Sequence, residues 1–145
     1  MRKVIVELGA RSYPIVIGSG IGDEIVSFIS QAGYSPHGMI VTDANVAPLC
    51  ADAAAELVAR AGVRADIVTI PAGESSKSLT QANELFTRAI ELGLDRKSPI
   101  IALGGGVVGD LAGFVAATYM RGVPFIQMPT SLLAQVDSSV GGKVA

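Results

Sequence analysis

Several residue types that point to particular chemistries are scarce in this 145-residue chain. It has one cysteine, Cys50, one histidine, His37, and no tryptophan. A single cysteine excludes an internal disulfide, and these two residues fall short of the three or four ligands that a zinc site needs. The sequence therefore predicts no metal site within these residues and a reducing, cytoplasmic location. We expect Cys50 to be a buried structural thiol and His37 to lie in a turn.

Charge is also sparse, and its two signs are nearly balanced. Lys, Arg, Asp and Glu make up 17% of the residues, and the formal net charge is −2. Proteins that bind nucleic acids carry clusters of Lys and Arg, so this composition predicts no nucleic-acid partner. Glu7 and Arg11 interrupt the apolar run that follows the first residues, so no secretory signal is expected there.

One long stretch, residues 99–120, is apolar enough to suggest a membrane segment. It contains five glycines and Asp110, which would make a poor helix in a bilayer. We therefore interpret it as a buried strand, a turn and a buried helix, and we expect no membrane partner.

Apolar residues make up half of the chain, and 17 residues are glycine, a composition typical of a packed domain with many turns. The length fits a single domain over residues 1–145. Apolar periodicity predicts a β-hairpin within residues 3–17, at the edge of a larger sheet. It then predicts helices at 20–32, 48–61, 79–90 and 107–119, alternating with strands at 39–42, 66–70, 99–103 and 124–128.

This alternation predicts an α/β fold with a mostly parallel sheet, whose ligands bind where the strands end. The helix at 79–90 is expected to start after a capping serine within residues 75–78. The helix at 48–61 is predicted from Leu49, Ala53, Leu57 and Ala61, which recur every four residues, and Gly62 is expected to end it.

A glycine cluster lies between the strand at 99–103 and the helix that follows it. Residues 104–109 read Gly-Gly-Gly-Val-Val-Gly, a spacing that lets backbone N–H groups approach a pyrophosphate. The usual dinucleotide motif also has an acidic residue about 20 positions later, but Gln127 lies roughly there. The cluster therefore indicates either a nucleotide site of different geometry or a purely structural tight turn.

Polar residues follow two other predicted strands. Asp43 and Asn45 could bridge the two hydroxyls of a ribose, or they could shape a turn and cap the next helix. Glu74 and Lys77 lie just before a helix. A lysine there is disfavoured by the helix dipole unless it meets an anion, which favours a ligand-binding role for Lys77 over a solvated capping loop.

The segment after the last predicted strand, residues 128–143, is dense in small polar groups. It contains Thr130, Ser131, Asp137 and Lys143. Asp137 and Lys143 could form a simple ion pair, but their position at the expected ligand edge also allows a functional role.

Two long segments resemble the signature motifs of the 3-dehydroquinate synthase family. Residues 104–122 read GGGVVGDLAGFVAATYMRG, and residues 129–143 read PTSLLAQVDSSVGGK. Asp43 with Asn45, and Glu74 with Lys77, match further cofactor positions of the family, so the resemblance covers residues 1–145. It implies a Rossmann-like three-layer domain that binds NAD. Members of the family are longer and have a second, α-helical domain with the metal ligands, which is absent from these residues.

The resemblance also implies roles for individual residues. Asp137 and Lys143 would lie near the reacting groups, and Arg121 would reach the substrate phosphate of the other subunit of a homodimer, a role suited to its planar permanent charge. A structural salt bridge is the alternative for Arg121. The residues implied to line the NAD site are Asp43, Asn45, Glu74, Lys77, Gly105, Gly106, Val107, Asp110, Thr130, Ser131 and Leu133.

The implied activity is that of a lyase of the shikimate pathway to aromatic amino acids. It converts 3-deoxy-D-arabino-heptulosonate 7-phosphate to 3-dehydroquinate and phosphate, with NAD as a transient hydride acceptor and Zn²⁺ or Co²⁺ polarising the alcohol. Because the metal ligands are expected elsewhere, we expect no turnover from these residues alone. The alternatives are another sugar-phosphate cyclase, a metal-dependent polyol dehydrogenase, or a nucleotide-binding module without catalysis.

Overall fold

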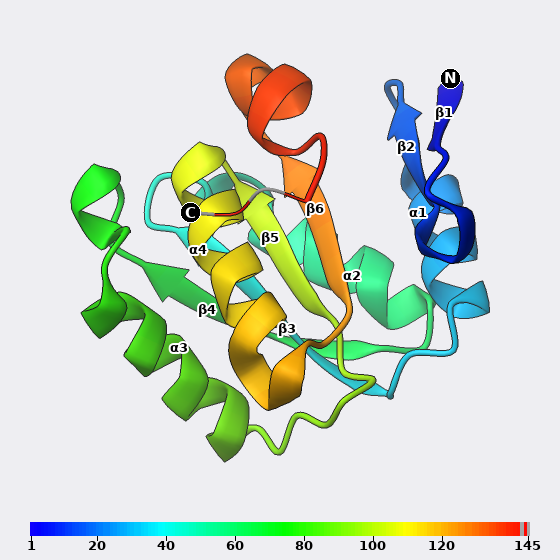
Figure 1. The fold of residues 1–145 in the computed structure, drawn as a ribbon. Coiled ribbons are helices and arrows are strands. Elements are labelled where there is room, and N and C mark those ends of the chain that lie inside the picture. The colour runs from blue at the N-terminus through cyan, green and yellow to red at the C-terminus, as the bar shows by residue number, and fades with distance from the viewer. Residues whose placement is uncertain (143, 145) are drawn as a thin grey trace.

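A four-stranded parallel sheet forms the centre of the computed structural model, which describes residues 1–142 and 144. Its strand order is β4-β3-β5-β6 (Figure 1). The sheet predicted from the alternation of elements is thus confirmed. Its strands are β3 (His37–Asp43), β4 (Arg64–Ile70), β5 (Ile100–Gly104) and β6 (Phe125–Pro129).

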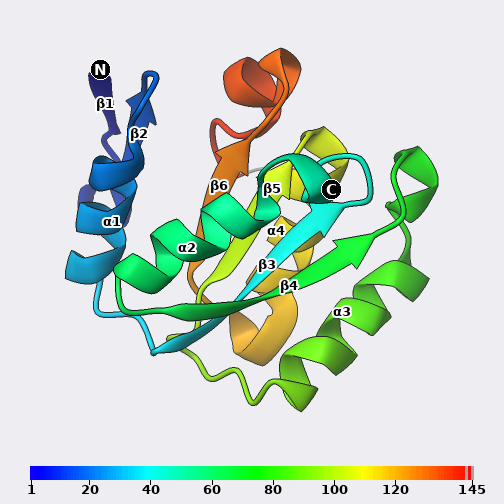
Figure 2. The same cartoon turned by 180° about the vertical axis from the view of Figure 1, so that it is seen from behind.

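Two layers of helices cover the sheet, as the α/β prediction requires. Helices α1 (Gly22–Gln31) and α2 (Asp52–Arg60) pack on one face, where Ile40 and Ile101 are buried (Figure 2). Helices α3 (Leu79–Glu91) and α4 (Gly106–Thr118) pack on the other face. Because both faces are covered, β5 is buried along its whole length, which explains its unbroken apolar sequence.

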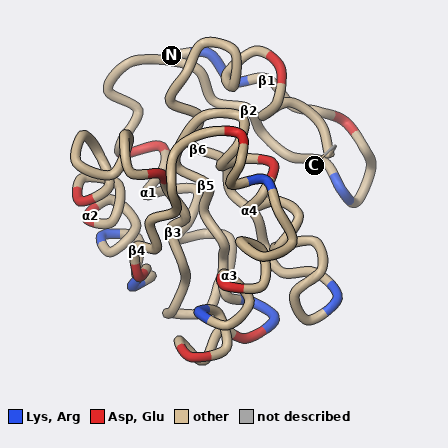
Figure 3. Tube along the Cα trace, turned by 90° about the vertical axis from the view of Figure 1, so that its left-hand side faces the viewer, with Lys and Arg blue, Asp and Glu red and all other residues tan. Residues whose placement is uncertain are grey.

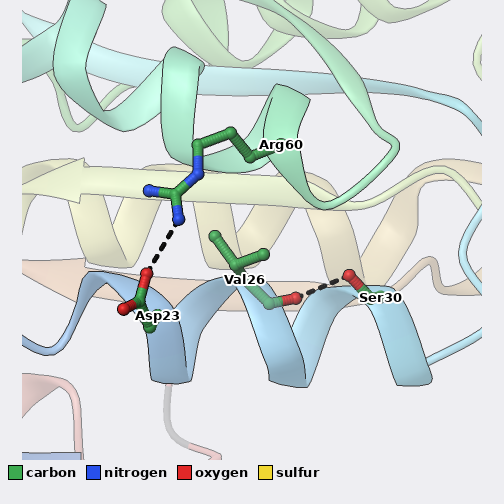
Figure 4. Close-up of polar contacts among 4 residues, drawn as sticks. All are labelled: Asp23, Val26, Ser30 and Arg60. Atoms are coloured by element: carbon green, nitrogen blue, oxygen red, sulfur yellow. Dashed lines mark hydrogen bonds and ion pairs between the residues drawn. The ribbon is translucent and has the colours of Figure 1, made fainter.

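An ion pair joins the two helices of the first layer, and a side-chain hydrogen bond lies within α1 (Figure 4). Arg60 Nη2 lies 2.8 Å from Asp23 Oδ1. Ser30 Oγ donates to the backbone oxygen of Val26 at 2.8 Å within α1. Since the Asp23 and Arg60 side chains are exposed, we expect their ion pair to add little to stability.

The N-terminal hairpin consists of β1 (Arg2–Val6) and β2 (Tyr13–Ile17), joined by a 3₁₀ turn (Gly9–Arg11). The prediction that it would lie at the edge of the main sheet is wrong, since it forms a separate two-stranded sheet. Pro14 lies within β2 and has no N–H with which to extend a ladder. Tyr13 instead accepts a hydrogen bond from the Gly141 N–H at 2.9 Å.

The helix predicted at 48–61 exists, but the residues that recur every four positions do not mark its buried face. The segment starts as a π-helical turn (Ala47–Ala51) and continues as α2. Leu49 is 81% exposed, and the buried residues are instead Ala51, Ala54 and Val58. A π turn is wider than an α turn, so residues before Asp52 are rotated relative to a regular helix.

Other local predictions have mixed outcomes. Ser78 caps α3 as expected, because its Oγ accepts the Gln81 N–H at 3.2 Å. Cys50 is half-buried beside the core of the α2 layer. His37 is the first residue of β3, where it is exposed, and it is not part of a turn.

Among the described residues, no helix is long and apolar enough to cross a membrane.

Candidate functional site

The candidate site lies at the carboxyl edge of the parallel sheet, where the segments after the four strands gather (Figure 1). Strands β3 and β5 are neighbours, yet the chain leaves β3 for the α2 layer and leaves β5 for the α4 layer. In α/β sheets such a switch point opens a crevice between the diverging loops, and ligands bind there. Gly105 directly follows β5 and therefore lies at this switch point.

The glycine cluster forms the turn between β5 and α4. A Cβ on Gly104 would lie 2.6 Å from Val108 Cγ2, so this glycine allows the helix to pack closely on its strand. Gly105 precedes α4, and no side chain caps the helix. The first N–H groups of α4 lack partners within the helix, so they are available to an anion.

Two serine hydroxyls border this turn. A Cβ on Gly105 would lie 3.7 Å from Ser131 Oγ, and a Cβ on Gly106 would lie 3.4 Å from Ser138 Oγ. Side chains at the two glycines would therefore narrow the space between α4 and the segment after β6. Ser138 was not predicted as a site residue. The one feature of the sequence that could have indicated it is its position next to Asp137.

Lys77 connects the loop after β4 to helix α4. Its Nζ lies 3.0 Å from Asp110 Oδ2 on α4 and 3.3 Å from Glu74 Oε1 in its own loop. The Lys77 and Asp110 side chains are 29% and 22% exposed. Hydrogen bonds to Asp110 and then to Glu74 raise the pKa of Lys77 above its ordinary value. Lys77, Glu74 and Asp110, which were all predicted as site residues, thus form one cluster, in which the lysine is charged.

Asp43 ends β3 and shapes the turn that follows it. Its Oδ1 accepts the N–H groups of Asn45 at 2.8 Å and Val46 at 3.0 Å. Asp43 thus shapes this turn, and Asn45 is exposed beside it. The preceding residue, Thr42, was not predicted as a site residue, although its hydroxyl is buried without a hydrogen-bond partner among the described residues.

The segment after β6 returns across the glycine turn. The Thr130 N–H donates to the Gly104 oxygen at 3.0 Å, and Ser131 Oγ accepts the Ala134 N–H at 3.2 Å. A π-helical turn (Ala134–Ser138) then carries Asp137, which is exposed. Leu133, just before this turn, is 70% exposed.

Gln127 has a structural contact that the sequence did not reveal. It lies in the middle of β6, and its Nε2 donates to the Ser139 oxygen at 3.3 Å. Gln127 therefore anchors the segment after β6 and does not stand in for the acidic residue of the usual dinucleotide motif.

One predicted residue, Arg121, is not brought to this edge, and another, Lys143, lies outside the described residues. Arg121 is in the turn before β6 (Tyr119–Arg121), at the opposite end of the sheet (Figure 1). The length of β6, roughly 16 Å for five residues, separates it from Thr130. Within the part of the chain that the structure describes, Arg121 forms no ion pair.

The donor set of this edge suits a nucleotide and not a metal ion. It offers the first N–H groups of α4, hydroxyls, a lysine and carboxylates. No three His, Cys, Asp or Glu side chains gather to hold a metal ion anywhere in residues 1–142 or at 144. Positive and negative charges are interspersed along the tube in Figure 3.

Comparisons with known proteins place this geometry in context. The sequence profile described as "3-dehydroquinate synthase N-terminal" matches residues 67–145. The 3-dehydroquinate synthase of Desulforamulus reducens is 59% identical over all of this chain, which spans 40% of that protein. A solved 2-deoxy-scyllo-inosose synthase in complex with carbaglucose-6-phosphate, NAD⁺ and Co²⁺ is 28% identical with a TM-score of 0.87, over 94% of this chain and 38% of that one.

A second solved structure is ValA, a 2-epi-5-epi-valiolone synthase from Streptomyces hygroscopicus with NAD⁺ and Zn²⁺ bound. It is 28% identical with a TM-score of 0.78, over 97% of this chain and 39% of that one. The fold and the edge site define a Rossmann-like α/β domain of the type found in sugar-phosphate cyclases. More narrowly, the chain belongs to the 3-dehydroquinate synthase N-terminal family. It spans about two-fifths of the length of the relatives that it matches.

Proposed function

We propose that residues 1–145 form the NAD-binding domain of a 3-dehydroquinate synthase. The observation that carries the proposal is the uncapped start of α4 at a glycine turn, beside the switch point of the sheet. The whole enzyme would be a cytoplasmic lyase that converts 3-deoxy-D-arabino-heptulosonate 7-phosphate to 3-dehydroquinate and phosphate. The family match and the 59% identical relative support this activity.

Charge suggests how NAD lies along the edge. The pyrophosphate would bind the N–H groups at Gly105, Gly106 and Val107, because these donors have no partner within the helix. The cluster of Glu74, Lys77 and Asp110 has one positive and two negative charges. The ammonium of Lys77 would donate a charge-assisted hydrogen bond to NAD, and the two carboxylates would hold that ammonium in position.

The other predicted residues would complete this arrangement. The carboxylate of Asp43 with Asn45 would hold a ribose on the β3 side. Thr130, Ser131 and Leu133 would cover the glycine turn from the β6 side, as their positions after β6 allow. Asp137 and Lys143 would lie nearest the reacting groups.

When bound, NAD would supply a reversible hydride acceptor, and the chain would hold and orient it. The metal, Zn²⁺ or Co²⁺, would require ligands from elsewhere in a longer protein, since no ligand set exists among the described residues. We therefore propose that these residues do not turn over substrate alone.

Arg121 supports a homodimer, because its position at the opposite end of the sheet keeps it from the site of its own chain. Its guanidinium could then bind the substrate phosphate only in another subunit. We propose this role in place of a structural salt bridge.

Calorimetric titration of NAD⁺ into the chain tests the cofactor proposal. We expect Lys77→Ala and Asp110→Ala to weaken binding by about ten-fold or more, as loss of one charge-assisted contact does. Arg88→Ala is the matched control, because it removes an exposed ion pair with Glu91 on α3, far from the glycine turn. Unchanged affinity in the folded Lys77→Ala variant would remove this residue from the site.

The substrate is tested separately with the longer gene product. Phosphate release should occur with the heptulosonate phosphate and not with sedoheptulose 7-phosphate, glucose 6-phosphate or glycerol. Phosphate release only with another of these sugars would contradict the proposed activity and would leave the NAD proposal intact.

A further inference from the structure

Gln127 is a polar residue in the middle of β6, whose other residues are all apolar. Its side chain is directed toward α4, because Phe125, two residues earlier, packs in the core on that side of the sheet and side chains alternate between the faces of a strand. The residue is half-buried. A polar side chain in such a place lowers stability unless it forms a hydrogen bond. The position of Gln127 therefore requires a specific partner.

Helix α4 leaves space for the Gln127 amide. A Cβ on Gly109 would lie 3.2 Å from Gln127 Oε1, and a Cβ on Gly113, one turn later, would lie 3.2 Å from Phe125 Cε1. Both glycines thus lie on the side of α4 that meets β6. The Gly109 N–H donates to the Gly105 oxygen at 3.0 Å, so it is not available to an anion. Gly109, the last residue of the glycine cluster, therefore serves the packing of Gln127 and not the approach of a phosphate.

Gln127 and Tyr13 hold the segment after β6 at two points. Gln127 Nε2 donates to the Ser139 oxygen at 3.3 Å, and the Gly141 N–H donates to the Tyr13 hydroxyl at 2.9 Å. Figure 1 shows that this segment rises beyond the end of β6 and then returns toward α4. The returning chain is thus held by one group from the main sheet and one from the N-terminal hairpin.

Ser138 directly precedes these two contacts and faces the start of α4. A Cβ on Gly106 would lie 3.4 Å from Ser138 Oγ and 3.8 Å from Ser138 Cβ. The Ser138 hydroxyl forms no hydrogen bond within residues 1–142 and 144, whereas the neighbouring Ser139 hydroxyl donates to the Gln135 oxygen at 3.4 Å. The first N–H groups of α4 lack partners within the helix. A phosphate bound to them would therefore lie beside a hydroxyl that can donate to it.

We infer that Gln127 is a positioning residue of the cofactor site and that Ser138 is a further residue that binds the dinucleotide phosphate. The Gln127 amide holds the Ser139 carbonyl, and this contact fixes the adjacent Ser138 hydroxyl across the glycine turn. The inference rests on the proposed NAD site. It gives Gln127 an indirect role in binding, through the backbone of the segment after β6.

Calorimetric titration of NAD⁺ tests the role of Ser138. Ser138→Ala should weaken binding about ten-fold, because it removes a hydrogen bond to a charged group. Ser30→Ala is the control, since it removes a serine hydroxyl that bonds within α1, and it should leave the affinity unchanged. Urea unfolding and circular dichroism check that each variant is folded.

A double-mutant cycle tests the role of Gln127. Gln127→Leu should weaken NAD⁺ binding about ten-fold, because leucine has a similar size but cannot hold the Ser139 carbonyl. In a Ser138→Ala background the same change should weaken binding by less than about two-fold, because the hydroxyl that Gln127 positions is already gone. A merely structural role of Gln127 would give the same fold-change in both backgrounds.

The outcomes separate this inference from the proposed NAD site. If the parent binds NAD⁺ and Ser138→Ala binds it equally well, the inference is overturned and the NAD site stands. Equal effects of Gln127→Leu in the two backgrounds would likewise overturn the positioning role alone. A folded parent that does not bind NAD⁺ would contradict the proposed site, and this inference with it.

Discussion

Thr42, near the carboxyl end of β3, is a polar residue whose burial is not offset by a hydrogen bond within the described residues. It is fully buried, and its Oγ1 has no hydrogen-bond partner among the described residues. A buried hydroxyl without a partner costs about 1–3 kcal/mol. Thr42→Val keeps the shape of the side chain and removes the hydroxyl, so it should raise the free energy of unfolding by about 1 kcal/mol. Urea unfolding at neutral pH measures this change.

Thr69→Val is the control for Thr42→Val. Thr69 lies opposite Thr42 on β4 but is exposed, so its substitution should change the stability by less than about 0.5 kcal/mol. A loss of stability in Thr42→Val would mean that the hydroxyl has a partner in solution. If NAD⁺ affinity falls as well, that partner is the ligand or a water molecule beside it.

Single residues of the site were predictable where their type alone restricts the chemistry. Gly105 and Gly106 have the spacing of a phosphate-binding turn, and Lys77 lies where the helix dipole disfavours a lysine. The contact between Lys77 and Asp110 depends on the packing of α4 beside the loop after β4. Sequence spacing cannot give that contact, so only the family resemblance placed Asp110 in the site.

At the scale of elements, the turn between α4 and β6 is a strained feature. Met120 has φ 49° and ψ 26°, and Arg121 has φ 68°. The left-handed conformation costs a residue with a side chain about 1–2 kcal/mol, whereas glycine adopts it freely but loses about 0.5–1 kcal/mol of chain entropy. Met120→Gly should therefore raise the free energy of unfolding by about 0.5–1 kcal/mol, as measured by urea unfolding.

Ala117→Gly is the matched control for Met120→Gly. It places a glycine three residues earlier, at an exposed position of α4, where it should lower the stability by about 0.5–1 kcal/mol. If Met120→Gly also lowers the stability, then contacts of the methionine side chain outweigh the backbone strain. A positive result would show that the turn which presents Arg121 is held at a cost to the fold.

The type of each helix and strand was predictable, but two of their placements were not. Buried strands such as β5 have continuous apolar sequences, and α3 has a clear apolar stripe. The buried face of α2 did not follow from the four-residue repeat, because alanines lie on every side of the helix and a π turn rotates its start. The hairpin was recognised, but its separation from the main sheet depends on long-range contacts such as Tyr13 with Gly141.

At the scale of the whole molecule, Asp95 joins the connections at the amino end of the sheet. Its carboxylate accepts the Ser35 hydroxyl at 2.7 Å and the Lys97 N–H at 2.7 Å. These segments precede β3 and β5, so the carboxylate ties the two central strands together at that end. The Ser35 hydrogen bond, followed by the Lys97 N–H, lowers the pKa of Asp95 below its ordinary value.

A lowered carboxyl pKa determines how stability depends on pH. The contribution of Asp95 is fully present above the pKa of an unfolded aspartate, about 3.9, and is lost as the pH falls through the lower folded value. Asp95→Asn should therefore be less stable than the parent at pH 7, and the difference should shrink as the pH falls below about 4. Urea midpoints measured between pH 7 and pH 3 give both quantities.

The control for Asp95→Asn is Glu56→Gln, because Glu56 is an exposed carboxylate on α2. No hydrogen bond or ion pair of its side chain occurs in the described part of the chain. Its substitution should leave the pH profile of the parent nearly unchanged. Profiles of Asp95→Asn and parent that stay parallel down to pH 3 would mean that Ser35 and Lys97 do not favour the ionised carboxylate. The amino-end connections would then be held by the backbone hydrogen bond from Ser35 to Lys97.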